Sequence, residues 1–388
     1  MRNDTLCILI RSNLSMLSKL NAWLHLWLGL VSGIIIVILS ITGCILVFKQ
    51  ELNVLTKPWM RVEQPQGKSQ LPPSVLYEQV SKQLPDNIIY NAWYHGQDRS
   101  VQMNIDSDSV VYVNPYTAEI IALVDHEDFF HFIEEGHYHL WLPDHIAHHV
   151  VGWSMAIFLI LLITGLVLWW PKKWNKKHRD DSFKIRWKAR FKRLNYDLHN
   201  VLGFYSLLIA LLMVLTALIM CFPWFSNAAY WVTGGVKTER IRSLSDTTQI
   251  QTVAQLSQVD KAWKLGMDSI GEYNKDQIII NYPKKASDVI SLCVDMTAGS
   301  WRYVNLDQHT LQQLPSTDLK MKDEQFAKWL RRSNYTLHVG AFGGIPTKIL
   351  YFVASLICAS LPITGFYVWW GKRKKNKKKT QSKRAVFN

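Results

Sequence analysis

Four long apolar blocks constrain this chain more than any other feature. None of the four contains Lys, Arg, Asp or Glu: residues 22–48, 146–170, 201–222 and 349–370. A bilayer core of roughly 30 Å needs about 20 helical residues, so each block is long enough to span it. In lipid a helix satisfies all its own backbone hydrogen bonds. The blocks therefore predict a membrane α-helical bundle with four transmembrane helices, at 22–48, 146–170, 196–222 and 346–370.

The basic residues gather in two segments, and their placement predicts the orientation. The loop at 171–195 is rich in Lys and Arg, and the tail at 371–388, which begins GKRKKNKKKTQSKR, has no acid. The positive-inside tendency places both segments in the cytoplasm, together with residues 1–21. Residues 49–145 and 223–345 then lie in the periplasm of a bacterial inner membrane. The net charge of +14 reflects this topology and attraction to anionic lipid, and we expect no nucleic-acid partner.

The N-terminal residues and the cysteines exclude several other features. Residues 1–15 contain charges and only a short apolar run, so we expect no cleaved signal peptide, with translation starting at Met1 or Met16. The five cysteines form no CxxC pair and no CxxCH sequence. Disulfide frameworks, thiolate zinc sites, four-cysteine iron–sulfur clusters and covalently attached haem are therefore not expected.

The chain repeats its own pattern, which predicts an internal two-fold duplication. The block LHLWLGLVSGIIIVILSITG matches LHNVLGFYSLLIALLMVLTA, and in both a His precedes a Thr by seventeen residues, His25 before Thr42 and His199 before Thr216. The second and fourth blocks end in ITGLVLWWPKK and ITGFYVWWGKR. Two repeats running in the same direction favour a pseudo-two-fold axis along the membrane normal.

The segments between the blocks predict two α+β domains, at 49–145 and 223–345. In each, an amphipathic helix pattern precedes alternating strand patterns. The first has its helix at 74–84 and its strands at 101–105, 110–113 and 119–124. The second has its helix near 253–265 and its strands at 278–282, 289–294 and 301–306. YVNPYTAEI and YVNLDQHTL mark matching places, so each half reads as helix, outer domain, helix.

Two pairs of histidines occupy matching depths in the two repeats. His25 and His199 lie near the cytoplasmic ends of the first and third helices, and His139 and His338 lie before the second and fourth. Ionisable residues at such positions usually face the bundle interior. A haem iron on the axis needs two axial donors, for which imidazole is the usual choice in b-type haem. From spacing alone, axial ligation and a plain interfacial role both stay open.

Other histidines compete for the outer position or suggest a weaker site. His145, His148 and His149 stand at the entrance of the second helix, and any of them is an alternative to His139. The stretch DHEDFFHFIEEGHYH, at 125–139, combines acids with His126, His131 and His137. Carboxylate and imidazole both suit transition-metal ions, so this stretch is a weak candidate for receiving a ferric complex. An acidic interfacial loop is the alternative interpretation.

The motifs together resemble a known family. LHLWLGLVSGIIIVILSITGCILVFKQEL, YHLWLP, ITGLVLWWPKK, YDLHNVLGFY and LHVGAFGGIPTKI are similar to the PepSY-associated transmembrane (PepSY_TM) proteins. That group includes iron-regulated inner-membrane proteins and ferric-siderophore reductases of the FoxB type. The resemblance implies a four-helix bundle carrying haem b, with periplasmic PepSY domains, and the two histidine pairs suggest two haems per chain. It assigns the axial ligands to His25, His199, His139 and His338. One departure is Ala118, which stands where a Thr-Gly pair is common.

The resemblance also implies a function and partners. A conduit of this kind is an oxidoreductase that reduces a ferric siderophore or other ferric chelate at the periplasmic face, so that iron leaves as iron(II). No catalytic acid, base or nucleophile is required. The chain has no Gly-rich dinucleotide motif, so electrons come from a separate donor, either a cytoplasmic reductase or the quinol pool. The alternatives are a transporter, and a non-enzymatic PepSY membrane protein that binds or inhibits a peptidase or senses envelope state.

Overall fold

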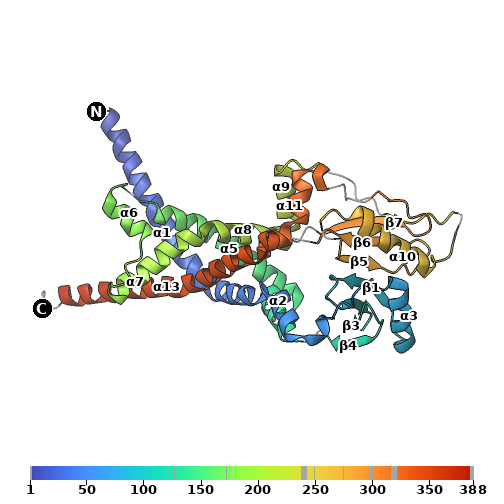
Figure 1. The fold of residues 1–388 in the computed structure, drawn as a ribbon. Coiled ribbons are helices and arrows are strands. Elements are labelled where there is room, and N and C mark those ends of the chain that lie inside the picture. Colours follow the sequence, from blue (N-terminus) through green and yellow to red (C-terminus); the bar gives the residue numbers. More distant parts are fainter. Residues whose placement is uncertain are drawn as a thin grey trace.

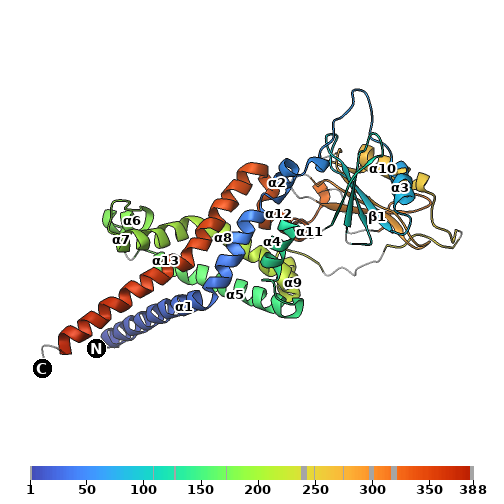
Figure 2. The same ribbon diagram turned by 90° about the horizontal axis from the view of Figure 1, so that it is seen from below.

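The computed structural model divides the protein into a long helical bundle and a sheet-bearing part at one end of it (Figure 1). It describes residues 2–107, 109–125, 128–171, 173–236, 243–248, 250–273, 275–296, 301–315 and 321–384. The helices that carry the two termini extend away from the sheet, and both termini lie at the opposite end of the molecule (Figures 1 and 2).

Four helical segments are long and apolar enough to cross a bilayer, which confirms the predicted four transmembrane helices. The first, second and fourth spans lie in α1 (Arg2–Leu46), α5 (Asp144–Trp169) and α13 (Gly344–Arg384). The third combines α7 (Phe191–Asp197), a π-helical turn at Leu198–Leu202 and α8 (Gly203–Cys221). The apolar spans are Met16–Leu46, Asp144–Trp169, Phe191–Cys221 and Ala341–Gly371.

The spans pack as a closed ring in the order α1, α5, α8, α13, so α1 and α8 face each other diagonally. A buried middle layer of Leu162, Ala210, Val214 and Cys358 joins α5, α8 and α13. Small residues allow close packing between helices in lipid. Gly33 of α1 shows this, since a Cβ there would stand 3.1 Å from Cβ of Pro362 in α13. Large apolar side chains point outward instead, as expected of a lipid-facing surface.

Shorter helices surround the two ends of the bundle. At the end near the sheet lie α2 (Lys49–Thr56), α4 (Phe129–Tyr138), α9 (Pro223–Val232), α11 (Phe326–Arg332) and α12 (Asn334–Val339). Single 3₁₀ turns at Pro58–Met60, Met321–Asp323 and Ala341–Gly343 connect them. At the other end, the basic loop between the second and third spans forms α6 (Lys176–Phe183).

The two outer segments share one antiparallel sheet of seven strands, in the order β4-β3-β2-β1-β5-β6-β7. The first segment supplies β1 (Ile89–Tyr94), β2 (Val101–Ile105), β3 (Ser109–Val113) and β4 (Ile120–Asp125). The second supplies β5 (Ile278–Asn281), β6 (Val289–Val294) and β7 (Arg302–Asp307). Because β1 pairs with β5, with Ala92 opposite Ile280, the two expected domains form one continuous sheet. The pairing satisfies two strand edges that separate domains would leave open.

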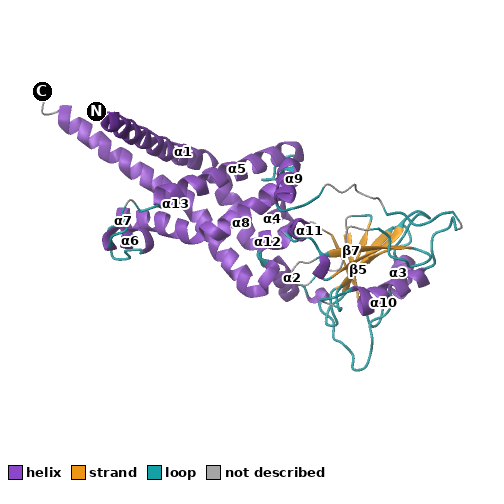
Figure 3. Cartoon of the chain, turned by 90° about the horizontal axis from the view of Figure 1, so that it is seen from above, coloured by secondary structure: helices purple, strands orange, loops and turns teal. Residues whose placement is uncertain are grey.

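The two faces of the sheet differ in chemistry. The helices α3 (Pro73–Gln83) and α10 (Leu256–Leu265) cover one face, with a short π-helical turn at Gly266–Ile270 after α10. That face holds the main core, where Leu76, Val259, Ile278 and Leu292 are fully buried. The other face carries aromatic and amide side chains toward the membrane helices, among them Trp93, His95, Gln102, Tyr112 and Trp301. Figure 3 shows the strands gathered apart from the bundle.

Candidate functional site

The end of the bundle away from the sheet contains the first histidine pair. His25 of α1 and His199 of the π-helical turn before α8 lie across the diagonal of the ring, with ring centres 6.3 Å apart and planes at 83°. The structure thus brings together the two histidines that the repeat places at equal depth. Both side chains are only partly buried by protein.

The second pair lies at the sheet end, and it contains His137. The rings of His137, in α4, and His338, in α12, have centres 6.3 Å apart, with planes at 56°. His139 instead caps α4, where its Nδ1 lies 3.0 Å from Glu135 Oε2 and its Nε2 lies 3.8 Å from Asp144 Oδ1. Residues two apart on a helix point in directions about 200° apart, so when His137 faces the bundle, His139 faces away. The outer pair is therefore His137 with His338, whereas we expected His139 with His338.

The competing histidines lie outside both pairs. His145, His148 and His149 are exposed on the first turns of α5, where the rings of His148 and His149 meet edge-on with centres 5.8 Å apart. His131 lies on α4 and lines the same cavity as His137. His126 lies outside the described residues.

The stretch at 125–139, predicted as a weak candidate for receiving a ferric complex, forms no metal site among the residues that the structure describes. No group of three His, Cys, Asp or Glu side chains there is placed to hold an ion. The acids of the stretch have other partners, since Glu134 binds Lys49 at 2.6 Å and Asp128 binds Lys57.

A threonine hydroxyl from a spanning helix binds each of the four paired imidazoles through Nδ1. The distances are 2.9 Å for His25 and Thr164, 3.0 Å for His199 and Thr364, 2.9 Å for His137 and Thr42, and 3.0 Å for His338 and Thr216. Each hydroxyl already donates to a carbonyl of its own helix, as Thr164 does to Ile160 at 2.8 Å. The threonine oxygen must therefore accept, and Nδ1 carries the proton.

Two further contacts support this tautomer. Nδ1 of His199 lies 3.1 Å from the Leu361 carbonyl, and Nδ1 of His338 lies 3.1 Å from the Met213 carbonyl. A carbonyl only accepts, so the ring nitrogen donates. Nε2 is then left unprotonated. Among the described residues no protein atom hydrogen bonds to Nε2 of the four rings, and none of these nitrogens is sealed from solvent.

The residue after each threonine is small, and this lets the ring approach. A Cβ on Gly43 would stand 3.2 Å from Cε1 of His137. Gly165 and Gly365 face Cε1 of His25 and His199 in the same way, each at 3.1 Å. Thr216 is followed by Ala217, so three of the four positions are Gly and the fourth is Ala. Each imidazole therefore sits on a Thr-Gly or Thr-Ala pair of a neighbouring helix.

An asparagine four residues before three of the histidines secures the same contact. Asn21, Asn195 and Asn334 donate from Nδ2 to the carbonyls of Thr164, Thr364 and Thr216, at 3.1, 2.9 and 3.0 Å. The sequence therefore carries an N-x-x-x-H signal at NAWLH, NYDLH and NYTLH, together with ITG or LTA at the receiving helix. Our sequence analysis missed both signals. His137 lacks the asparagine, because Ile133 stands at that position.

Both outer imidazoles are neutral at ordinary pH. Burial, with the neighbouring His338 as a second cause, lowers the pKa of His137 to about 4, and burial lowers the pKa of His338. A neutral imidazole with a free Nε2 has the protonation state that metal ligation requires. With a metal–nitrogen bond of about 2.0 Å and a nitrogen-to-ring-centre distance of about 1.1 Å, two imidazoles that bound one ion from opposite sides would have centres roughly 6.2 Å apart. Both pairs have this separation.

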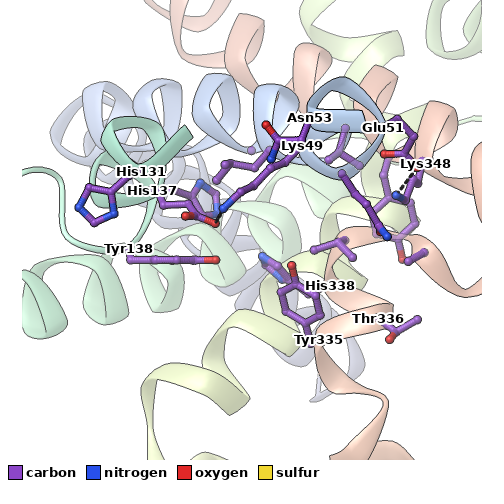
Figure 4. A pocket seen from close by; sticks show the side chains of 18 of the residues that line it. Lys49, Glu51, Asn53, His131, His137, Tyr138, Tyr335, Thr336, His338 and Lys348 are labelled. Atoms are coloured by element: carbon purple, nitrogen blue, oxygen red, sulfur yellow. Dashed lines mark hydrogen bonds and ion pairs between the residues drawn. The ribbon is translucent and has the colours of Figure 1, made fainter. Parts of the chain in front are cut away.

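A cavity of about 1500 Å³ extends from the middle of the bundle, past the outer pair, to the sheet. Its inner part is lined by apolar side chains of the spanning helices, including Leu39, Met155, Phe158 and Val214. Its outer part is lined by charged side chains of α2, α4 and α13 and by the aromatic face of the sheet. We call this space the outer chamber. Figure 4 shows His137, His338, Lys49 and Lys348 among the side chains that line this space.

Comparison with known proteins agrees with this architecture. The family model of the PepSY-associated TM region matches residues 22–372. No curated protein matches the chain. The matched range includes most of the first span, the other three spans, the sheet and both histidine pairs.

Proposed function

Because the chain belongs to the family of the PepSY-associated TM region, we propose that it is a haem-b electron conduit of the bacterial inner membrane that reduces ferric chelates. Ferric siderophores are the expected substrates, and the periplasmic face is the expected site of reduction. The observation that carries this proposal is the pair of equal 6.3 Å imidazole separations, each with Nδ1 bound and Nε2 free.

The donor set itself favours a macrocycle. Each site offers two protein ligands and, among the described residues, no third His, Cys, Asp or Glu to complete a metal site. Two imidazoles suffice when a planar macrocycle supplies the four equatorial donors, as in bis-histidine haem. When bound there, haem supplies one-electron exchange between iron(III) and iron(II). His25 with His199 would hold the inner group, and His137 with His338 the outer one.

The remaining residues position the imidazoles and exclude water. The threonine and asparagine contacts fix the tautomer and ring orientation, which is the usual role of hydrogen bonds behind a ligand. The buried layer of Leu162, Ala210, Val214 and Cys358 separates the two pairs and keeps their surroundings apolar. Nothing in this layer titrates near neutral pH, so it favours passage of electrons without protons.

The matching threonine contacts of the two halves support the internal duplication, and the orientation rests on the charge pattern alone. With the basic loop and tail in the cytoplasm, the inner pair is the entry point and the outer chamber opens to the periplasm. The electron donor is then a separate cytoplasmic reductase or quinol. The ferric chelate is the substrate, and the outer chamber is where it meets the outer pair.

The test is a spectrum and a haem count on the purified full chain in nanodiscs. We expect Soret absorption, an α-band that sharpens on dithionite addition, and two haems per chain. His137→Ala should lose one haem, and the matched variant His139→Ala should keep both. Size-exclusion elution at the wild-type position shows that each variant is inserted. The reduced protein should also convert a ferric siderophore to iron(II), detected by a ferrous-specific dye.

A colourless protein would overturn the proposal and favour the alternative, a PepSY membrane protein that binds or inhibits a peptidase or senses envelope state. A protein that loses its outer haem with His139→Ala and keeps it with His137→Ala would overturn the ligand assignment. The first result concerns the function, and the second concerns only which residues serve it.

A further inference from the structure

Basic side chains line the outer chamber at the level where its lining changes from apolar to polar. Lys348 lies within the spanning segment Ala341–Gly371, its side chain is only 11% exposed, and it binds Glu51 of α2 at 2.6 Å. Lys49, at the start of α2, binds Glu134 of α4 at 2.6 Å. A lysine within a spanning segment is energetically expensive and by default indicates a function. A buried ion pair is weak evidence of a stabilising role, so the pair with Glu51 alone does not account for a lysine at this position.

Several other residues that line the chamber have polar atoms without a hydrogen-bond partner. Glu51 Oε2, Asn53 Oδ1, Thr336 Oγ1 and the Tyr351 hydroxyl are buried without a hydrogen-bond partner, and all four residues line the chamber. Arg332, which binds Glu324 and also lines the chamber, has Nη1 in the same condition. Buried polar groups in proteins are nearly always paired. Of these atoms, Arg332 Nη1 and the Thr336 and Tyr351 hydroxyls can donate to a carboxylate, whereas Glu51 Oε2 and Asn53 Oδ1 can only accept.

We propose that Lys49 and Lys348 are the carboxylate anchors of the outer site, holding the two propionates on one edge of the haem. This inference rests on the proposed function. The macrocycle between His137 and His338 is an amphipathic disc, so its apolar body belongs among Leu39, Phe158 and Val214. Its carboxylate edge belongs at the boundary where the lysines stand. Burying a carboxylate without a cation is strongly unfavourable.

The lysines have capacity for this role. An ammonium group has three donors, and in each lysine the structure uses one on a glutamate, so two remain for a propionate. Figure 4 shows Lys49 near His137 and Lys348 beside Glu51. Lys57 provides a matched control, because it follows α2, lines the same chamber and is paired with Asp128. It lies two helical turns beyond Lys49 in sequence.

The experiment measures haem affinity while the lysines of the protein and the carboxylates of the ligand are removed separately and together. The full chain, produced without haem and placed in nanodiscs, is titrated with iron protoporphyrin IX and with its dimethyl ester. For the free acid we expect Lys49→Met with Lys348→Met to weaken binding at the outer site about tenfold to a hundredfold, as charge-assisted hydrogen bonds are lost. For the dimethyl ester we expect a change below about threefold. Lys57→Met should behave as wild type with both.

Redox titration supplies a second readout. Without the lysines the propionate charges are less compensated, which stabilises iron(III), so the midpoint potential of the outer haem should fall. Equal loss of affinity for acid and ester, or an unchanged potential, would overturn the inference. So would the case in which the variants weaken only the binding of ferric citrate, since the lysines would then serve the chelate. These outcomes leave two haems in the wild type, so they differ from failure of the proposed function.

Discussion

The hydrogen bond between Thr164 and His25 allows a direct test of how the bundle orients its imidazoles. Thr164 Oγ1 accepts from His25 Nδ1 at 2.9 Å while donating to the Ile160 carbonyl at 2.8 Å. Thr164→Val keeps the shape of the side chain and removes only the hydroxyl. Because Thr164 is 7% exposed, water does not readily replace the lost acceptor. The imidazole then loses the contact that holds its tautomer and its ring angle.

The magnitude follows from the burial of the contact. A typical net hydrogen bond is worth about 0.5–1.5 kcal/mol, and leaving a buried donor unsatisfied costs about 1–3 kcal/mol. Removing a hydrogen bond behind a metal ligand typically lowers metal affinity about 10–100-fold. A 10–100-fold loss of affinity corresponds to about 1.4–2.8 kcal/mol, which agrees with the cost of about 1–3 kcal/mol for an unsatisfied buried donor. We expect haem affinity at the inner site to fall about tenfold or more, with the outer site unchanged.

The assay is transfer of haem from the purified variant to an excess of a haem-scavenging protein, followed in the Soret band. Electron paramagnetic resonance of the oxidised protein reports the ring angle separately. Thr164→Ser should restore the wild-type rate, because it restores the oxygen. Thr233→Val is the matched control, since the Thr233 hydroxyl bonds only to carbonyls of its own helix, Ala229 at 2.7 Å and Tyr230 at 3.0 Å.

Two outcomes would refute the reasoning. If Thr164→Val loses haem at the wild-type rate with an unchanged resonance spectrum, the hydroxyl does not orient the ligand. If Thr164→Ser is as defective as Thr164→Val, the methyl group rather than the oxygen matters.

Two further predictions concern packing and pH. Gly365→Ala places a methyl group 3.1 Å from His199 Cε1, which is closer than an ordinary contact. We therefore expect Gly365→Ala to lower the haem content of the inner site and the control Gly371→Ala to leave it unchanged. Equal haem content in both variants would contradict the close-packing argument. Burial lowers the pKa of His95, whose Nε2 is sealed without a partner, to about 4. The imidazole of the unfolded chain has a pKa near 6.5, so below that pH the unfolded state gains protons that the folded state does not. The free energy of unfolding is therefore unaffected by His95 above pH 6.5 and falls as the pH drops toward 4, by about 2 kcal/mol at pH 5. His95→Gln should flatten the loss of thermal stability between pH 8 and pH 5, and an unchanged slope would assign the loss to other groups.

Several features could be predicted from the sequence because they depend on local chemistry. A spanning helix closes its own hydrogen bonds, so each charge-free block is sufficient to predict one span. The strand pattern at 101–105 depends on alternation along a single strand, and β2 lies there. The depth of His25 and His199 follows from the span that carries each, which is why the predicted neighbours meet.

Other features depended on contacts between distant residues. Whether His137 or His139 faces His338 is decided by the rotation of α4 against α1, where Thr42 and Gly43 receive the ring ninety-five residues away in sequence. The joining of the outer segments depends on β1 finding β5, and the outer chamber exists only where that sheet stands over the bundle. The sequence by itself therefore determined the spans and the residues available to bind a cofactor. The tertiary structure decided which imidazoles meet, because hydrogen bonding between helices has no periodicity that a single segment displays.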